Sequence, residues 1–229
     1  MLEKLFYYIL TFTFLLIPLT IFFFRNRIKR SDSIAMGSYG VLFFLLLYAI
    51  DNSFVPSSYL KLYQTGYTLF EYSFFTYFLF TNITIKSLRK IIVSLSFLFL
   101  LFLIYNFFWE NLLKIDSIPV GIETILILIY ISFFLYQNFH ATTDVFIYNN
   151  SCFWLAIGIL IYLGSTFFFN ILVNHIEEEQ IEKYWFLTYI SDIIKNLLFC
   201  VSIIIYANTT QKEKLHNHKH IPYLDLDMN

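Results

Sequence analysis

An acid and a base lie three positions apart inside the last long apolar stretch of the chain: Asp192 and Lys195, followed directly by Asn196. Residues three apart share one face of an α-helix, so the carboxylate and the ammonium can neutralise each other there. A charged side chain in a membrane span costs about 2.5 to 3.5 kcal/mol, and such residues mark functional sites by default. The pair therefore predicts a polar site within the last helix.

Further acidic residues interrupt other apolar stretches, and Lys195 is the one cation expected deep inside a span. Glu71 has no cation in its own stretch, so we expect Glu71, Asp192 and Lys195 to form one network between two helices. Glu123 and Asp51 add two more carboxyl groups. The predicted ligand pocket, with neutral polar residues included, comprises Asp51, Glu71, Glu123, Tyr162, Asn170, Asp192, Lys195 and Asn196.

Other chemistry has little support in the sequence, and we predict no catalytic residue, no metal site and no cofactor. His216, His218 and His220 alternate near the C-terminus and could hold a metal only in an extended conformation, so a solvated tail is expected. Cys152 and Cys200 fall in or beside apolar runs. They are expected to be small buried hydrophobic residues rather than a disulfide, with an acylated Cys152 as the alternative.

The composition excludes a water-soluble fold. Of 229 residues, 59% are hydrophobic and only 14% are charged, which is far from the makeup of soluble domains. The apolar runs are continuous rather than alternating, which favours helices over a barrel, and a net charge of -1 does not favour nucleic acid. Seven segments reach the roughly 20 residues that a spanning helix needs. They are 5–24, 34–54, 62–83, 90–109, 119–138, 152–173 and 184–206.

Lysine and arginine residues are divided unequally between the two sides of these spans. With the N-terminus placed outside, ten of them fall in inside segments and four in outside segments, as the positive-inside rule requires for seven spans. Four basic residues within 25–30 follow the first apolar run and only Lys4 precedes it, so we expect an anchor rather than a cleaved signal. The sequence predicts an all-α integral membrane protein: a seven-helix transmembrane bundle at 1–207, N-terminus outside, and a short polar cytoplasmic tail at 208–229.

The predicted charges are not spread evenly through the membrane. Under this topology Glu71, Glu123 and Asp192 lie roughly 8 to 14 Å from the outer ends of their helices, at about 1.5 Å per residue. Asp51 lies near the outer face and Lys195 close to the midplane, while the inner halves are nearly all apolar. We therefore expect a cavity open to the outside, lined by acids, amides and tyrosines. The alternative is that these groups only fix helix packing, through hydrogen bonds worth about 0.6 to 2 kcal/mol each.

Three resemblances bear on the function. Lys195 in the last helix, with Glu71 as a possible counterion, resembles a retinal-binding opsin, but that family typically separates its last-helix acid and lysine by four positions. The seven spans also resemble sugar-efflux transporters built from two three-helix repeats, whose several intrahelical prolines are absent here apart from Pro18 and Pro119. The topology is similar to the seven-helix sensor halves of bacterial histidine kinases, here without the kinase.

These features predict a multi-pass sensor or receptor-like subunit in the cell (inner) membrane. It would bind an unknown small or lipidic ligand in its outer half. The tail is too short to fold as an output domain, so signalling would need a separate cytoplasmic protein. The alternatives are a small-molecule transporter and a membrane-embedded lipid enzyme that uses Glu71 and Asp192 as an acid and base pair.

Overall fold

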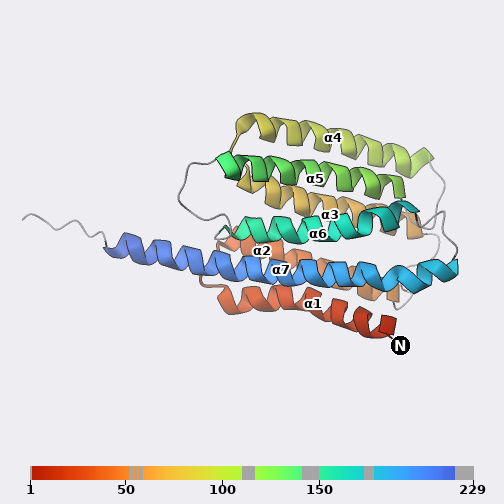
Figure 1. The fold of residues 1–229 in the computed structure, drawn as a ribbon, viewed down its shortest axis with the longest axis horizontal. Helices are drawn as coiled ribbons and strands as arrows, with labels where there is room; N and C mark the ends of the chain where they lie inside the picture. Colours follow the sequence, from red (N-terminus) through yellow and green to blue (C-terminus); the bar gives the residue numbers. More distant parts are fainter. Residues whose placement is uncertain are drawn as a thin grey trace, which may run out of the picture.

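The computed structural model describes residues 2–51, 54, 56, 59–109, 117–140, 150–172 and 178–219 of the chain. Within these residues it contains seven α-helices and no strand. The helices are α1 Leu2–Phe24, α2 Arg30–Asp51, α3 Leu60–Asn82, α4 Lys86–Trp109, α5 Ser117–His140, α6 Ser151–Leu172 and α7 Glu178–Lys219. Consecutive helices run in opposite directions, so they form an up-and-down array with their axes side by side (Figure 1).

Six helices begin and end within a few residues of the predicted spans, because long apolar runs with few Gly or Pro residues form uninterrupted helices. The exception is α7, for which the sequence predicts 184–206, whereas the helix has 42 residues. Residues 208–219, expected as part of a tail, are helical because this stretch contains Lys, Glu and Gln but neither Gly nor Pro. As a result, α7 extends beyond the other helices at one end of the molecule (Figure 1).

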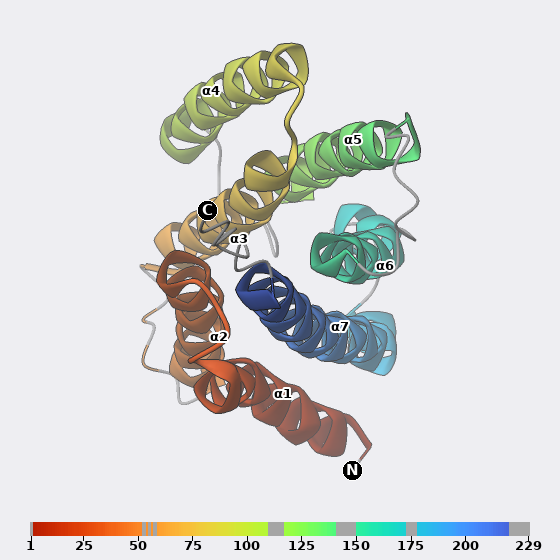
Figure 2. The same cartoon turned by 90° about the vertical axis from the view of Figure 1, so that its left-hand side faces the viewer.

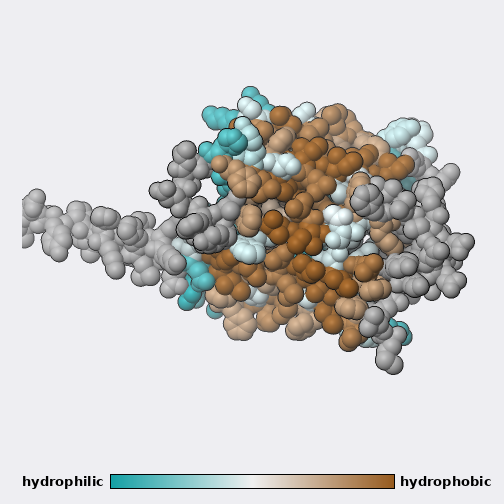
Figure 3. Space-filling view, viewed as in Figure 1, coloured by the Kyte–Doolittle hydropathy of each residue, from teal (hydrophilic) through white to brown (hydrophobic). Residues whose placement is uncertain are grey.

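Five helices contain a stretch long and apolar enough to cross a membrane: α1, α2, α4, α5 and α7. Lys61, Gln64 and Glu71 interrupt the apolar sequence of α3, and the described apolar part of α6, Ser151–Phe167, is shorter. Figure 3 shows that one lateral face of the described residues is largely apolar, with hydrophilic side chains gathered toward its ends. These features indicate a membrane protein with a lipid bilayer as its environment.

α7 occupies the middle of the array. In the end-on view, α1, α2, α3 and α6 lie around it, and α4 lies on the outside beside α3 and α5 (Figure 2). α7 packs most extensively against α6 and α1. Aromatic side chains fill much of the interior, and the largest fully buried ones include Phe14, Tyr39, Phe43, Phe75 and Phe199. Side chains of α7 therefore reach neighbours on several helices.

Two glycines allow close helix contacts. Gly158 of α6 faces the backbone of α7, and a Cβ added there would lie 3.3 Å from the Lys195 carbonyl oxygen. Gly40 of α2 is tighter, since an added Cβ would lie 2.8 Å from the Phe14 carbonyl oxygen and 2.8 Å from Pro18 Cδ. Small residues at such positions let helix backbones approach each other, as is common in membrane proteins.

Candidate functional site

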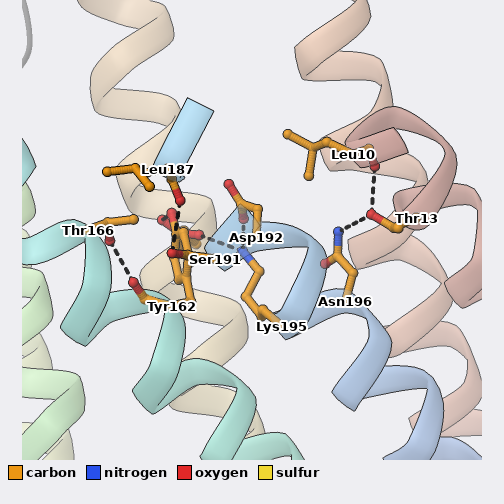
Figure 4. A network of polar contacts seen from close by, with 10 residues as sticks. Leu10, Thr13, Tyr162, Thr166, Leu187, Ser191, Asp192, Lys195 and Asn196 are labelled. Atoms are coloured by element: carbon orange, nitrogen blue, oxygen red, sulfur yellow. Dashed lines mark hydrogen bonds and ion pairs between the residues drawn. The ribbon is translucent and has the colours of Figure 1, made fainter. Parts of the chain in front are cut away.

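Lys195 is the centre of a polar cluster inside the bundle. It lies on α7 and is 0% exposed. Its ammonium nitrogen donates to Asp192 Oδ1 at 2.5 Å, one turn earlier on the same helix, and lies 3.6 Å from Glu71 Oε1 on α3. Figure 4 shows the Lys195 side chain extending toward Asp192. The structure thus brings Glu71, Asp192 and Lys195 together as an ion cluster that joins α3 to α7.

Glu71 stands at the midpoint of α3 and is buried. Its Oε2 atom accepts a hydrogen bond of 3.2 Å from the Tyr162 hydroxyl on α6. Its Oε1 atom, which faces Lys195, has no hydrogen-bond partner among the described residues. One carboxylate therefore connects α3 with both α6 and α7.

Four aromatic rings surround the Lys195 ammonium. The nitrogen lies 3.6 Å from the centroid of the Tyr162 ring. The ring centroids of Phe14, Tyr39 and Phe75 lie 5.8, 5.9 and 5.7 Å away. A desolvated ammonium over an aromatic face gains about 2 kcal/mol from cation–π attraction. These four rings, the aromatic cage, therefore offset part of the cost of burying the charge.

Glu123 of α5 adds a further acid to this region and is 1% exposed. It lies close enough to Glu71 and Lys195 to interact electrostatically with both. Its Oε1 atom has no hydrogen-bond partner in the part of the chain that the structure describes. Together with Asp192, the region sets three carboxyl groups against one ammonium. An unequal cluster of this kind can take up a proton.

Asn196 belongs to a different contact from its neighbour Lys195. Its Nδ2 atom donates to Thr13 Oγ1 on α1 at 3.0 Å, and the Thr13 hydroxyl donates to the Leu10 carbonyl at 2.7 Å. Figure 4 shows Asn196 pointing toward α1. Asn196 therefore joins α7 to α1 and does not contact the ion cluster through this bond.

The remaining predicted pocket residues are Asp51, at the end of α2, and Asn170, in α6, whose side chains lie outside what the structure describes. Glu71 and Tyr162 lie near the midpoints of their helices. The expected position of the cluster in the outer half of a membrane stays a prediction. Contacts of α3 with α5 and α6 determine which residue of α3 is level with Lys195, and no single segment contains that information.

Sequence reasoning did not identify Phe14, Tyr39 and Phe75 as neighbours of Lys195. The chain contains 29 Phe and 18 Tyr residues, so residue type alone cannot mark the few that line a site. Thr13 was also missed. The first helix holds three threonines, Thr11, Thr13 and Thr20, so residue type alone does not show which of them makes a polar contact with another helix.

Metal-binding chemistry has no site in the described residues, which contain no group of three or more His, Cys, Asp or Glu side chains that could hold an ion. Cys152 and Cys200 are free thiols, the first buried and the second partly buried. His216 and His218 lie in the last turns of α7, but their side chains are outside the described set, and His220 lies beyond the described residues.

A cavity of about 390 Å³ lies at the end of the bundle where α1 ends and α2 begins. Its wall includes Lys29, Asp32, Cys152, Ser202 and Tyr206, and none of these is in the predicted pocket. Lys29 lies in the basic segment within 25–30, and Asp32 precedes the predicted span 34–54, so both charges lie where the sequence predicts a connection between two spans. Polar residues near the ends of several helices converge there, although each is unremarkable within its own segment.

The chain was compared with protein family models, with curated proteins and with solved structures, and none of them matches it. Its function is therefore inferred from the ion cluster, the cavity and the fold.

Proposed function

We propose that the chain is a multi-pass sensor or receptor-like subunit of the cell (inner) membrane, in which all seven helices cross the bilayer. The N-terminus is outside and the C-terminus is cytoplasmic. The basic residues within 25–30 and 86–90 support this orientation, since positively charged loops remain on the cytoplasmic side. α3 tolerates polar residues in a span because its neighbours cover them, as the burial of Thr68 and Glu71 indicates.

The bridge from Lys195 to Glu71 is the observation that supports a ligand-responsive role. Replacing a buried ion pair with apolar residues is often neutral or stabilising, so such a pair is weak evidence for a purely structural role. Charges inside a membrane protein are costly and typically functional. A cluster at the junction of α3, α6 and α7 therefore favours a role in switching over packing alone.

A small or lipidic ligand would act on this cluster by population shift. A polar group that pairs with Glu71 or Lys195 weakens the bridge between α3 and α7 and so favours a second packing of these helices. α7 continues past the bundle to Lys219, where its movement can reach a separate cytoplasmic signalling protein. The proposal keeps Asp51 and Asn170 as pocket residues on the grounds of sequence alone.

Ligand binding by the purified protein tests this proposal. Small molecules and lipids are screened by thermal shift, and affinities for the hits are measured with Lys195→Ala and Glu71→Gln. Each variant should weaken binding about tenfold or more, which corresponds to roughly 1.4 kcal/mol. Lys90→Ala removes an exposed lysine of α4 and is the matched control. If both cluster variants bind every hit with wild-type affinity, the proposed pocket is wrong.

Reporter fusions test the orientation separately. A reporter that is active only in the cytoplasm should be active when fused after residue 219, and a reporter that is active only outside should be silent there. The opposite pattern would contradict the proposed orientation and the outward-facing pocket with it.

A small-molecule transporter is the second candidate, and the cavity beside Lys29 favours it. The ion cluster at mid-helix and this cavity place polar groups at two depths of the bundle. Alternating access needs a site that can be reached from either side. Uptake of the screening hits into proteoliposomes separates the two functions, because a transporter accumulates the hit and a sensor only binds it.

A membrane-embedded lipid enzyme has less support from the geometry. Glu71 and Asp192, its proposed acid and base, both contact the same Lys195 ammonium. Each carboxylate is thereby turned toward a shared cation instead of toward an open substrate site.

A further inference from the structure

The cavity where α1 meets α2 lies apart from the ion cluster. Residues of α1, α2, α3, α6 and α7 line it, and its volume of about 390 Å³ is of the size that holds small molecules. Its wall combines apolar side chains with several hydroxyl groups. It also holds one side chain of each charge, Lys29 and Asp32.

Asp32 is held in place and still has capacity for a ligand. It lies in the first turn of α2, where its Oδ2 atom accepts a bond of 2.9 Å from the Tyr206 hydroxyl and its Oδ1 atom accepts one of 3.1 Å from Ser31. A carboxylate offers about four acceptor positions, and these two bonds, the ones seen among the described residues, use two of them. Lys29 immediately precedes α2, is exposed, and offers ammonium donors in the same wall.

We propose that this cavity binds a small zwitterion, a molecule with an ammonium group and an anionic oxygen group. The ammonium pairs with Asp32, and the anionic group pairs with Lys29 and nearby hydroxyls. A purely anionic ligand would meet the Asp32 carboxylate, and a purely cationic one would meet Lys29, so neither matches the wall as well. A zwitterionic lipid headgroup and a free amino acid share the required chemistry.

A ligand in the cavity also affects the contacts of α7 with its neighbours, and this step rests on the proposed function. Tyr206 and Ser202 both lie on α7, and the Ser202 hydroxyl donates to the Ser151 carbonyl of α6 at 2.7 Å. A ligand ammonium at Asp32 shares the carboxylate with the Tyr206 hydroxyl and so changes the link between α2 and α7. Tyr206 lies roughly 16 Å along the helix from Lys195, so the ligand regulates the ion cluster through α7.

The two cysteines of the chain provide a reporter and its control. Cys152 is buried in the cavity wall, whereas Cys200 is not among the residues that line the cavity. The variant Cys200→Ala leaves Cys152 as the only thiol, and Cys152→Ala leaves Cys200. The rate of alkylation of each full-length variant by a small maleimide is measured in nonionic detergent. Glycerophosphoethanolamine, leucine and inorganic phosphate are added in separate experiments.

At roughly ten times its dissociation constant, a bound zwitterion should slow alkylation of Cys152 about tenfold and leave that of Cys200 unchanged. Protection by glycerophosphoethanolamine alone assigns a lipid headgroup, protection by leucine alone assigns a free amino acid, and protection by both supports the shared chemistry. Asp32→Asn and Lys29→Ala, each made in the Cys200→Ala protein, should lose most of the protection. Because Lys29 is exposed, its replacement leaves the fold intact.

Three results would overturn the proposal: no protection by either zwitterion, equal protection by phosphate, or full protection in either of the two wall variants. None of them depends on the Lys195 and Glu71 variants described above. Failure of the zwitterion site is therefore distinguishable from failure of the proposed sensor function.

Discussion

The Lys195 ammonium lies 3.6 Å from the centroid of the Tyr162 ring, and the hydroxyl of that ring donates to Glu71 at 3.2 Å. One side chain of α6 thus contacts both the cation of α7 and its acidic partner on α3. Tyr162 therefore helps to determine how far apart the two charges lie, and any change in the position of α6 alters the strength of the ion cluster.

Substitutions of Tyr162 should separate its two contacts. Tyr162→Phe keeps the ring but removes the hydroxyl, and should lower the free energy of unfolding by about 0.6 to 2 kcal/mol. Tyr162→Leu also removes the ring and should cost roughly 1 to 2 kcal/mol more. Unfolding in mixed detergent micelles measures both losses in the free energy of unfolding. The same two substitutions at the exposed Tyr136 serve as controls. Equal losses for the Phe and Leu variants would show that the ring contributes nothing.

Neutralising Lys195 alone should be more damaging than neutralising the whole cluster. Lys195→Met leaves Asp192 and Glu71 in the interior without their cation, so we expect a loss of about 3 to 5 kcal/mol. The triple variant with Glu71→Gln and Asp192→Asn should recover most of this loss, because neither of the two carboxylates that contact Lys195 is then left without its cation. The midpoint temperatures of thermal unfolding show whether the single variant is less stable than the triple variant, and Lys90→Met serves as the control. A single variant as stable as the wild type would contradict the assignment of a charged cluster.

The contact between α1 and α2 should not tolerate a methyl group at Gly40. An added Cβ would lie 2.8 Å from the Phe14 carbonyl oxygen, so Gly40→Ala should destabilise the protein by about 1 to 3 kcal/mol. Gly66 of α3 is the matched control, because an added Cβ there meets nothing within 4 Å. Gly66→Ala should be neutral or stabilise by about 0.5 to 1 kcal/mol, through helix propensity. Equal effects in the same unfolding assay would rule out the close contact.

Gln137 should hold the short connection between α3 and α4. Its Oε1 atom accepts bonds from the amides of Thr84 at 2.6 Å and Ile85 at 3.2 Å, and its Nε2 atom donates to the Asn82 carbonyl at 3.1 Å. Gln137→Ala should lower local stability by about 1 kcal/mol. Hydrogen exchange of the Thr84 and Ile85 amides should become faster, and Ser132→Ala should leave it unchanged. No change in these amides would show that water replaces the side chain without cost.

Helix positions and the pairing of Asp192 with Lys195 could be read from the sequence. Apolar runs of sufficient length form helices whatever surrounds them, and a spacing of three residues places two side chains on one face of any helix. The length of α7 was underestimated, because hydropathy detects the apolar part of a helix and is insensitive to a polar continuation such as residues 208–219.

The partners of Lys195 on other helices depend on how those helices pack. Glu71 was predicted as a partner on charge alone, since an isolated acid in a span needs a cation. The rings of Phe14, Tyr39 and Phe75 carry no such signal, because a phenylalanine beside an ammonium has the same sequence context as one facing lipid. The hydrogen bond from Asn196 to Thr13 likewise depends on the rotation of α7 relative to α1.

The sequence by itself determines the apolar helices, the membrane environment that they indicate and the costly charges within them. Each of these depends on one segment and its solvent. The position of the ion cluster, its aromatic cage and the polar cavity where α1 ends and α2 begins depend on the relative rotation and register of five or more helices. Those are determined by side-chain packing between segments far apart in the chain, which local hydropathy does not describe.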